Sequence, residues 1–260
     1  MRSILVQAGP DRHNSARIDT AMAIARASSG HVTLLIDTPL DPFVTTNPYG
    51  GTYVAREALE AAIAADDALG RALEGQLANS DVPFDVCKME GPPLDAMLAA
   101  AKLADLIVVS RDCGFTGDLA IEADCPVLAL GDLPLAVPVT TACIAWDGGQ
   151  QCARALRSAA PLLTTCREVR ILTVKDGASG DFPATDPLRY LAGHRIKAEL
   201  TELAKSMSVE ETIAAEVARL GASLLVMGAY SHTRLREFMF GGVTRYFLNF
   251  AAGPALLLAH

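Results

Sequence analysis

The stretch that decides the fold is LLVMGAYSHTRLREFMFGGVTR, which runs from Leu224 to Arg245. Its opening apolar run ends at a glycine, which is typical of a fully buried strand in a parallel sheet. A polar, basic loop follows, and a Gly-Gly pair then begins a new amphipathic segment. Backbone N–H groups at a helix start are free to bind an anion, and the helix dipole favours negative charge there. The stretch therefore predicts a phosphate-binding turn at the carboxyl end of a strand, although an ordinary strand-to-helix turn also uses glycines for its backbone geometry.

The same order of elements occurs twice along the chain, once in residues 1–134 and again in residues 139–260. Such self-similarity indicates an internal duplication, so we expect two domains with these bounds. Short apolar runs alternate with alanine-rich or amphipathic segments, which predicts an α/β fold with parallel sheets and helices on both faces. A loop is expected over residues 39–51 and a long helix over 52–78. The expected strands cover residues 4–8, 31–36, 84–88, 106–109, 126–130, 143–146, 169–174, 195–200, 224–227 and 254–258.

The two halves differ at the positions that would bind a ligand. The second half has a long glycine-containing loop after Met227, whereas residues 110–125 of the first half contain no Gly-Gly pair that begins a helix of comparable length. The first strand of the second half is followed by Asp147, and the first half has no acid at the matching place after Ala8. A carboxylate just past such a strand can accept hydrogen bonds from a nucleotide's base or ribose. We therefore expect one site, in the second half.

Composition excludes several classes of function. The chain has 260 residues and a net charge of -8, with no long basic run, which argues against nonspecific binding of nucleic acid or of an anionic membrane. No apolar stretch is long enough to span a bilayer. The first residues favour a core strand over a signal peptide, which predicts a cytoplasmic protein. The six cysteines contain no CxxC pair and are expected to be buried small residues; Cys113, in a loop, is the candidate for a reactive thiol.

Three stretches carry a resemblance to the universal stress protein family in its tandem two-domain form: IAWDG at 144–148, MGAYSHTRLRE at 227–237 and FGGVTR at 240–245. The resemblance covers essentially the whole chain and is strongest in the second half. The family's nucleotide-binding pattern is glycine, two residues, glycine, nine residues, then glycine with Ser or Thr. Gly228 and Gly241 match that spacing, while Ser231 stands where the second glycine is expected. Gly242 stands where Ser or Thr is expected, and Thr244 supplies a hydroxyl two residues later.

The resemblance implies a specific architecture and ligand. Each half would form a five-stranded parallel sheet in the order 3-2-1-4-5, and the halves would pair through their last strands as an internal pseudo-dimer, with further homodimerisation left open. The second half would bind ATP, with or without Mg²⁺. Asp147 would contact the ribose or adenine, unless it serves only as a helix N-cap. The remaining predicted binding residues line the base pocket or the phosphate cradle: Val174, Met227, Gly228, Ser231, His232, Gly241, Gly242, Val243 and Thr244.

These observations predict a stress-response regulatory protein that binds an adenine nucleotide in its second half. The sequence has no Walker-type Gly-Lys-Ser or Gly-Lys-Thr and no Ser/His/Asp signature. No catalytic residue and no metal site is predicted, and ATP hydrolysis is expected to be slow at most. Two alternatives stay open at this stage. One is an enzyme of the wider adenine-nucleotide-binding α/β group that acts on an unidentified small molecule, and the other is a partner-binding module that binds no nucleotide.

Overall fold

Each half of the chain contributes five strands to one sheet. The structure is a computed structural model that describes residues 1–46, 52–175, 183–230, 242–250 and 252–260. The elements of the first half are β1 (Ser3–Ala8), α1 (Asn14–Ser28), β2 (His31–Thr38), η1 (Asp41–Phe43), β3 (Val44–Thr46), β4 (Thr52–Val54), α2 (Arg56–Leu77), β5 (Phe84–Glu90), α3 (Pro93–Ala100), η2 (Ala101–Leu103), β6 (Leu106–Ser110), α4 (Thr116–Glu122) and β7 (Val127–Leu130). Those of the second half are β8 (Thr141–Ala145), α5 (Gln150–Leu163), β9 (Glu168–Lys175), α6 (Thr185–Gly193), β10 (Ala198–Ala204), α7 (Val209–Arg219), β11 (Leu224–Gly228), α8 (Gly242–Asn249) and β12 (Ala255–Ala259).

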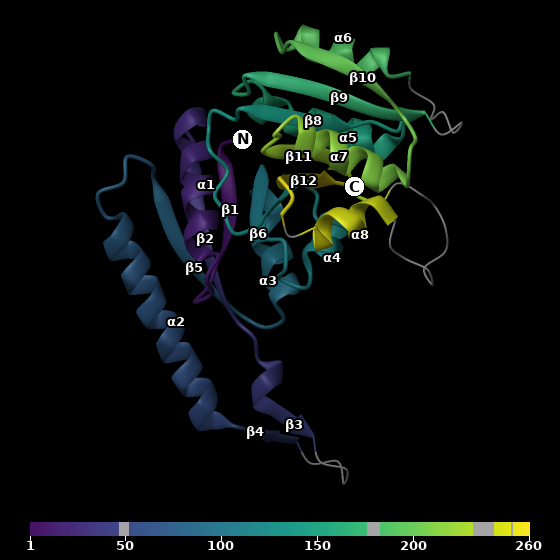
Figure 1. Cartoon of the computed structure of the whole chain (residues 1–260). Helices are drawn as coiled ribbons and strands as arrows, with labels where there is room; N and C mark the ends of the chain where they lie inside the picture. The colour runs from purple at the N-terminus through teal and green to yellow at the C-terminus, as the bar shows by residue number, and fades with distance from the viewer. Residues whose placement is uncertain (47–51, 176–182, 231–241, 251) are drawn as a thin grey trace.

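The strand order confirms the predicted α/β class and the 3-2-1-4-5 arrangement in each half. The described residues form a ten-stranded sheet in the order β10-β9-β8-β11-β12-β7-β6-β1-β2-β5. Within each half all neighbours are parallel. The halves meet where β12 pairs with β7 in antiparallel register, with Leu257 opposite Leu128. The sheet is therefore continuous from one half to the other (Figure 1).

Helices cover both faces of this sheet. Alternate strand residues point to opposite faces, so Ile4 and Val6 join one apolar core and Leu5 joins the other. Helices α1, α2, α5 and α6 contribute to the first core, and α3, α4, α7 and α8 contribute to the second. A strand covered on both faces has no polar side, which explains why Leu106–Val109 is an unbroken apolar run that is fully buried.

The two ends of α7 follow ordinary capping chemistry. Ser208 is its N-cap and accepts a hydrogen bond on Oγ from the Glu211 backbone N–H at 3.2 Å, and the Glu211 carboxylate accepts from the Ser208 N–H at 3.2 Å. This capping box satisfies two N–H groups at the start of α7. After α7, Gly221 adopts a φ of 59°, the left-handed conformation that glycine supplies at helix C-termini.

Several predicted boundaries shift by a residue or two, the loop predicted over 39–51 contains η1 and β3, and two element starts are clearly wrong. The helix predicted over 52–78 begins at Arg56, because Thr52–Val54 instead forms β4 and pairs antiparallel with β3. The third strand of the second half begins at Ala198 and not at residue 195, because Arg195 has a φ of 61° and closes a turn after α6. Positive φ is incompatible with an extended strand.

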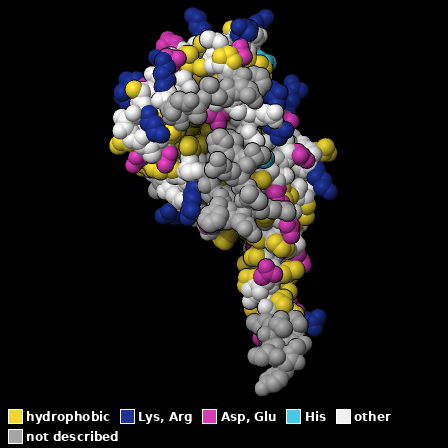
Figure 2. Space-filling view, turned by 90° about the vertical axis from the view of Figure 1, so that its right-hand side faces the viewer, with side chains coloured by type: hydrophobic (Ala, Val, Ile, Leu, Met, Phe, Trp, Pro, Cys, Tyr) yellow, Lys and Arg dark blue, Asp and Glu magenta, His cyan; other side chains and the backbone are white. Residues whose placement is uncertain are grey.

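The β3–β4 hairpin and the first turns of α2 project from the sheet as an arm (Figure 1). The space-filling view shows hydrophobic and acidic side chains on this arm with a basic side chain near its tip, and Lys and Arg are otherwise scattered over that face (Figure 2). Among the described helices, none is both long and apolar enough to cross a membrane.

Candidate functional site

Three of the predicted binding residues lie at the carboxyl ends of three neighbouring strands in the second half. β8 lies between β9 and β11, with Ala145 opposite Leu172 and Ile144 opposite Val226. Asp147 follows the end of β8, Val174 lies near the end of β9, and Met227 is the penultimate residue of β11. The topology therefore places these three residues at one edge of the sheet. This edge is next to the point where the strand order reverses, at which open α/β sheets bind ligands.

Asp147 is exposed and shapes the turn into α5. Its Oδ1 accepts a hydrogen bond from the Gly149 backbone N–H at 2.8 Å. Gly149 itself is the N-cap of α5, so Asp147 closes the turn before the helix and does not cap the first helical N–H groups. The intervening Gly148 has a φ of 79°, which a residue without a Cβ adopts freely. The carboxylate thus stands at the sheet edge, accessible to a ligand.

Gly228 has a packing role that the sequence analysis did not identify. A Cβ on Gly228 would lie 2.6 Å from the Cys152 backbone N and 2.7 Å from the carbonyl carbon of Gln151. The first turn of α5 therefore rests directly against the end of β11, and only glycine permits that approach. Met227 is 4% exposed and packs, with the half-buried Val174, in the core beneath α7 and α8.

The first turn of α8 contains three more of the predicted residues. Gly242 is exposed, and of the described residues a Cβ placed on it would meet only the Glu210 carboxylate oxygen, at 3.9 Å. Thr244 is buried, and its Oγ1 accepts a hydrogen bond from the Tyr230 backbone N–H at 3.3 Å. This bond ties the helix start to the end of β11. Val243 is half-buried against the same core. The other predicted cradle residues, Ser231, His232 and Gly241, lie outside the described residues.

The matching edge of the first half is filled by Arg17, which the sequence analysis did not find. Arg17 is 1% exposed. Its Nε donates to the Gln7 carbonyl at 2.6 Å, and its Nη1 donates to the hydroxyl of Ser110. Its guanidinium also binds both carboxylate oxygens of Asp11, at 2.9 and 2.6 Å. Ser110 is the fifth residue of β6, as Gly228 is of β11. An internal ion pair therefore occupies the crevice between β1 and β6.

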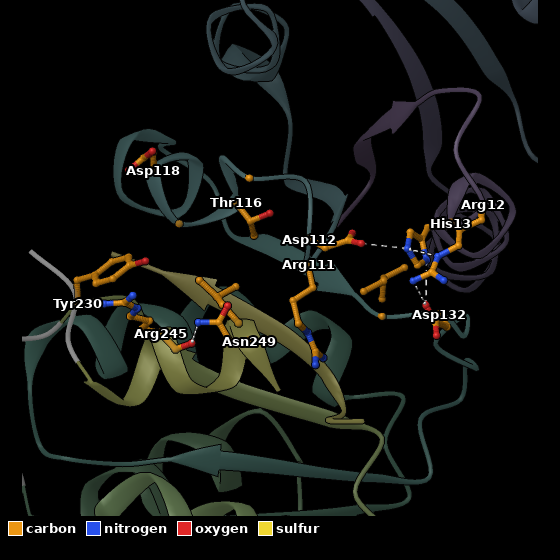
Figure 3. A pocket seen from close by; sticks show the side chains of 15 residues that line it. Arg12, His13, Arg111, Asp112, Thr116, Asp118, Asp132, Tyr230, Arg245 and Asn249 are labelled. Atoms are coloured by element: carbon orange, nitrogen blue, oxygen red, sulfur yellow. Dashed lines mark hydrogen bonds and ion pairs between the residues drawn. The ribbon is translucent and has the colours of Figure 1, made fainter. Parts of the chain in front are cut away.

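A cavity of about 630 Å³ lies between the halves and was also not predicted (Figure 3). The first half supplies the β1–α1 and β6–α4 loops and the turn after β7, and the second half supplies Tyr230 and α8. At one end, the buried His13 ring lies between two carboxylates. Its Nε2 is 3.2 Å from Asp112 Oδ2, and its Nδ1 is 3.3 Å from Asp132 Oδ1. Arg12 contacts the same Asp132 oxygen at 3.4 Å.

Arg111 crosses from the first half to the second at this cavity (Figure 3). Its guanidinium donates to the backbone carbonyls of Phe250 and Pro254 and, at 3.3 Å, to that of Gly253. These carbonyls belong to the turn between α8 and β12, so Arg111 holds the end of α8 against the first half. Burial without a carboxylate partner lowers the pKa of Arg111.

The cysteines are free thiols, as far as the structure describes the chain. Burial raises the pKa of Cys143, Cys152 and Cys166 to about 12 and that of Cys125 to about 11. Burial also raises the pKa of Cys113. Because the thiolate is the nucleophile, this shift argues against the predicted reactivity of Cys113. Among the described residues, no group of three or more His, Cys, Asp or Glu side chains is arranged to hold a metal ion.

The chain is similar to known proteins both in the sequence of its second half and in its overall fold. Residues 139–258 match the sequence profile of the Universal stress protein family. A universal stress protein from Archaeoglobus fulgidus has 11% identity and a TM-score of 0.73, covering 99% of this chain and 95% of its own. A protein of unknown function from Pseudomonas aeruginosa has 15% identity and a TM-score of 0.60, covering 100% and 92%. At these identities the likeness is one of fold. A search of curated proteins found no match.

Proposed function

We propose that the second half binds an adenine nucleotide in a stress-response regulatory role, on the premise that residues 139–258 match the universal stress protein family. The proposal rests above all on one observation. Asp147, Val174 and Met227 come from three neighbouring strand ends, and the first turn of α8 is tied to the third of these ends by the Tyr230–Thr244 hydrogen bond.

Each part of this edge suits one part of a nucleotide. The exposed carboxylate of Asp147 would accept hydrogen bonds from ribose hydroxyls or from an adenine amino group. Among the described residues, nothing crowds Gly242, and the N–H groups of the first turn of α8 would bind phosphate oxygens. The Thr244 hydroxyl accepts a hydrogen bond from the Tyr230 N–H, which would hold the cradle in place, and its own proton could be donated to a phosphate oxygen.

We further propose that the nucleotide is ATP, with or without Mg²⁺, because Gly228 and Gly241 keep the family spacing. Hydrolysis is expected to be slow at most, since the sequence lacks a Walker-type lysine. Nucleotide occupancy would then act by favouring one conformation or one partner. The two halves, as domains 1–134 and 139–260, would behave as an internal pseudo-dimer.

The test begins with mass spectrometry of nucleotide released when the purified full chain is denatured. Titration calorimetry with ATP, ADP and AMP then measures affinity for the wild type and for Asp147→Ala. We expect the variant to bind at least about tenfold more weakly, which is about 1.4 kcal/mol. Asp124→Ala is the matched control, because Asp124 is an exposed acid of the first half. Equal binding by Asp147→Ala and wild type would refute the site, and rapid turnover of labelled ATP would favour an enzyme.

A further inference from the structure

The cavity between the halves is a second candidate binding site. It is separate from the proposed nucleotide site at the carboxyl ends of β8, β9 and β11. Its volume of about 630 Å³ falls in the range of small-molecule sites, about 300–1,000 Å³. Three loops of the first half form one side, and α8 with Tyr230 forms the other. Neither half alone encloses it.

The charged side chains that line the cavity are balanced in number, and Arg12 lies with Asp132 at the His13 end. Three arginines and three aspartates contribute to the wall: Arg12, Arg111, Arg245, Asp112, Asp118 and Asp132. The formal charges of these six side chains cancel. A wall with equal numbers of cations and anions does not select a polyphosphate or a polyamine, because either would meet as many like charges as opposite ones. It suits a ligand that carries one charge of each sign.

Carboxylate oxygens for a cation lie at the His13 end. The side chains of Asp112 and Asp132 are 64% and 73% exposed. The contact of Asp112 with His13 uses Oδ2, and the contacts of Asp132 with His13 and Arg12 use Oδ1. The second oxygen of each carboxylate can therefore accept hydrogen bonds from an ammonium group.

A donor for an anion lies at the centre, on a buried arginine. Arg111 is 7% exposed, and its Nη groups bind the carbonyls of the α8–β12 turn. Its Nε–H is buried and has no hydrogen-bond partner among the described residues. A buried donor without an acceptor costs free energy. A ligand carboxylate would supply that acceptor after a small shift of the Arg111 side chain, because the Nε atom itself is not exposed. Arg245, which lies on α8 beside Tyr230, is a second cation of the wall (Figure 3).

We propose that this cavity binds a small zwitterion of the amino-acid class. The ligand's carboxylate lies toward Arg111 and Arg245, and its ammonium group lies toward Asp112 and Asp132. No covalent chemistry is involved. The ligand would bridge the halves, because its two charged groups meet residues of both.

The experiment is titration calorimetry on the full chain with each of the twenty common amino acids. Four compounds serve as comparison probes. Succinate and inorganic phosphate carry only negative charge, putrescine carries only positive charge, and glucose is uncharged. We expect one or a few amino acids to bind and the comparison probes to bind at least about tenfold more weakly. Asp112→Asn and Arg245→Gln should each weaken amino-acid binding about tenfold. Asp124→Asn and Arg157→Gln, which lie outside the cavity, should leave it unchanged.

Each result that contradicts the proposal would lead to a different conclusion. Binding of succinate or phosphate as tightly as any amino acid would make the cavity an anion site, and preferential binding of putrescine would make it a cation site. Binding that Asp112→Asn and Arg245→Gln both leave unchanged would place the ligand elsewhere. No binding by any amino acid would refute the proposal. Thermal unfolding of each variant confirms folding, and none of these outcomes depends on nucleotide binding.

Discussion

The guanidinium of Arg17 binds the carboxylate of Asp11 through two hydrogen bonds, at 2.9 Å from Nη1 to Oδ1 and at 2.6 Å from Nη2 to Oδ2. This bidentate pair lies where the first half would otherwise have an open crevice between β1 and β6. It gives a physical reason for the difference between the halves. The crevice of the first half is filled by the Arg17 side chain. The corresponding position in the second half has Asp147 followed by glycines.

The first prediction is that nucleotide binding saturates at one molecule per chain. Arg17 and Asp11 occupy the first-half crevice, and the first half lacks the glycine spacing of the second. Calorimetric titration of the wild type with ATP should give a stoichiometry close to one. Two equivalent sites would show that the ion pair moves aside for a ligand.

The second prediction concerns acid stability. The hydrogen bond from Arg17 holds the pKa of Asp11 below its ordinary value of 3.8. A carboxylate whose pKa is lower in the folded state stabilises that state above its unfolded pKa, and the contribution is lost as pH falls toward the folded value. The wild type should therefore lose free energy of unfolding below about pH 4, and Asp11→Asn should lose less over the same range. Urea unfolding between pH 2.5 and 7 measures both; parallel curves would show that the pair contributes nothing.

The third prediction compares two glycines of the proposed nucleotide site. Gly228→Ala would force a Cβ to within 2.6 Å of the Cys152 N, and such overpacking costs about 1–3 kcal/mol. Gly242→Ala meets no described atom closer than 3.9 Å and replaces a helical glycine, which should stabilise the chain by about 0.5–1 kcal/mol. Denaturant unfolding should give opposite signs for the two variants. Equal effects would contradict the packing of α5 on β11.

The fourth prediction concerns the contact between the halves. Arg111→Met removes the donors from three carbonyls of the α8–β12 turn, and unsatisfied buried carbonyls cost about 1–3 kcal/mol each. Part of this cost is offset, because a buried charge is removed as well. We expect a loss of about 2 kcal/mol in the free energy of unfolding. Hydrogen exchange should also rise at the amides of residues 252 and 253, which precede Pro254. Arg157→Met, at an exposed arginine of α5, is the control; if it costs as much, the Arg111 contacts do not stabilise the chain.

The repeated sheet was predictable because strands buried on both faces have long apolar runs, and these runs recur in the same order in both halves. The N-cap of α7 was predictable for a similar reason, since Ser208 and Glu211 stand at the fixed spacing of a capping box. The β3–β4 hairpin was not, because its strands have three residues each and no alternation that distinguishes them from a loop.

One cause explains why the sequence did not predict the roles of Arg17, Arg111 and His13. Each contacts at least one partner that is distant in the sequence, and a lone charged residue near a helix start is usually solvent-exposed. An arginine among small apolar residues of α1 was the one available signal for Arg17. For Arg111 no local signal existed, because its acceptors are backbone carbonyls about 140 residues away.

The antiparallel pairing of β7 with β12 also bears on whether either half could exist by itself. Unpaired edge strands are templates for aggregation, and the two strands here are the apolar segments VLAL and ALLLA. Separating the halves would expose both, whereas the outer strands of the intact sheet, β5 and β10, carry charged residues such as Lys88 and Glu199. Each half thus covers the apolar edge strand of the other. If the chain were cleaved between the halves and they separated, β7 and β12 would be free to pair with strands of other molecules, which would favour aggregation.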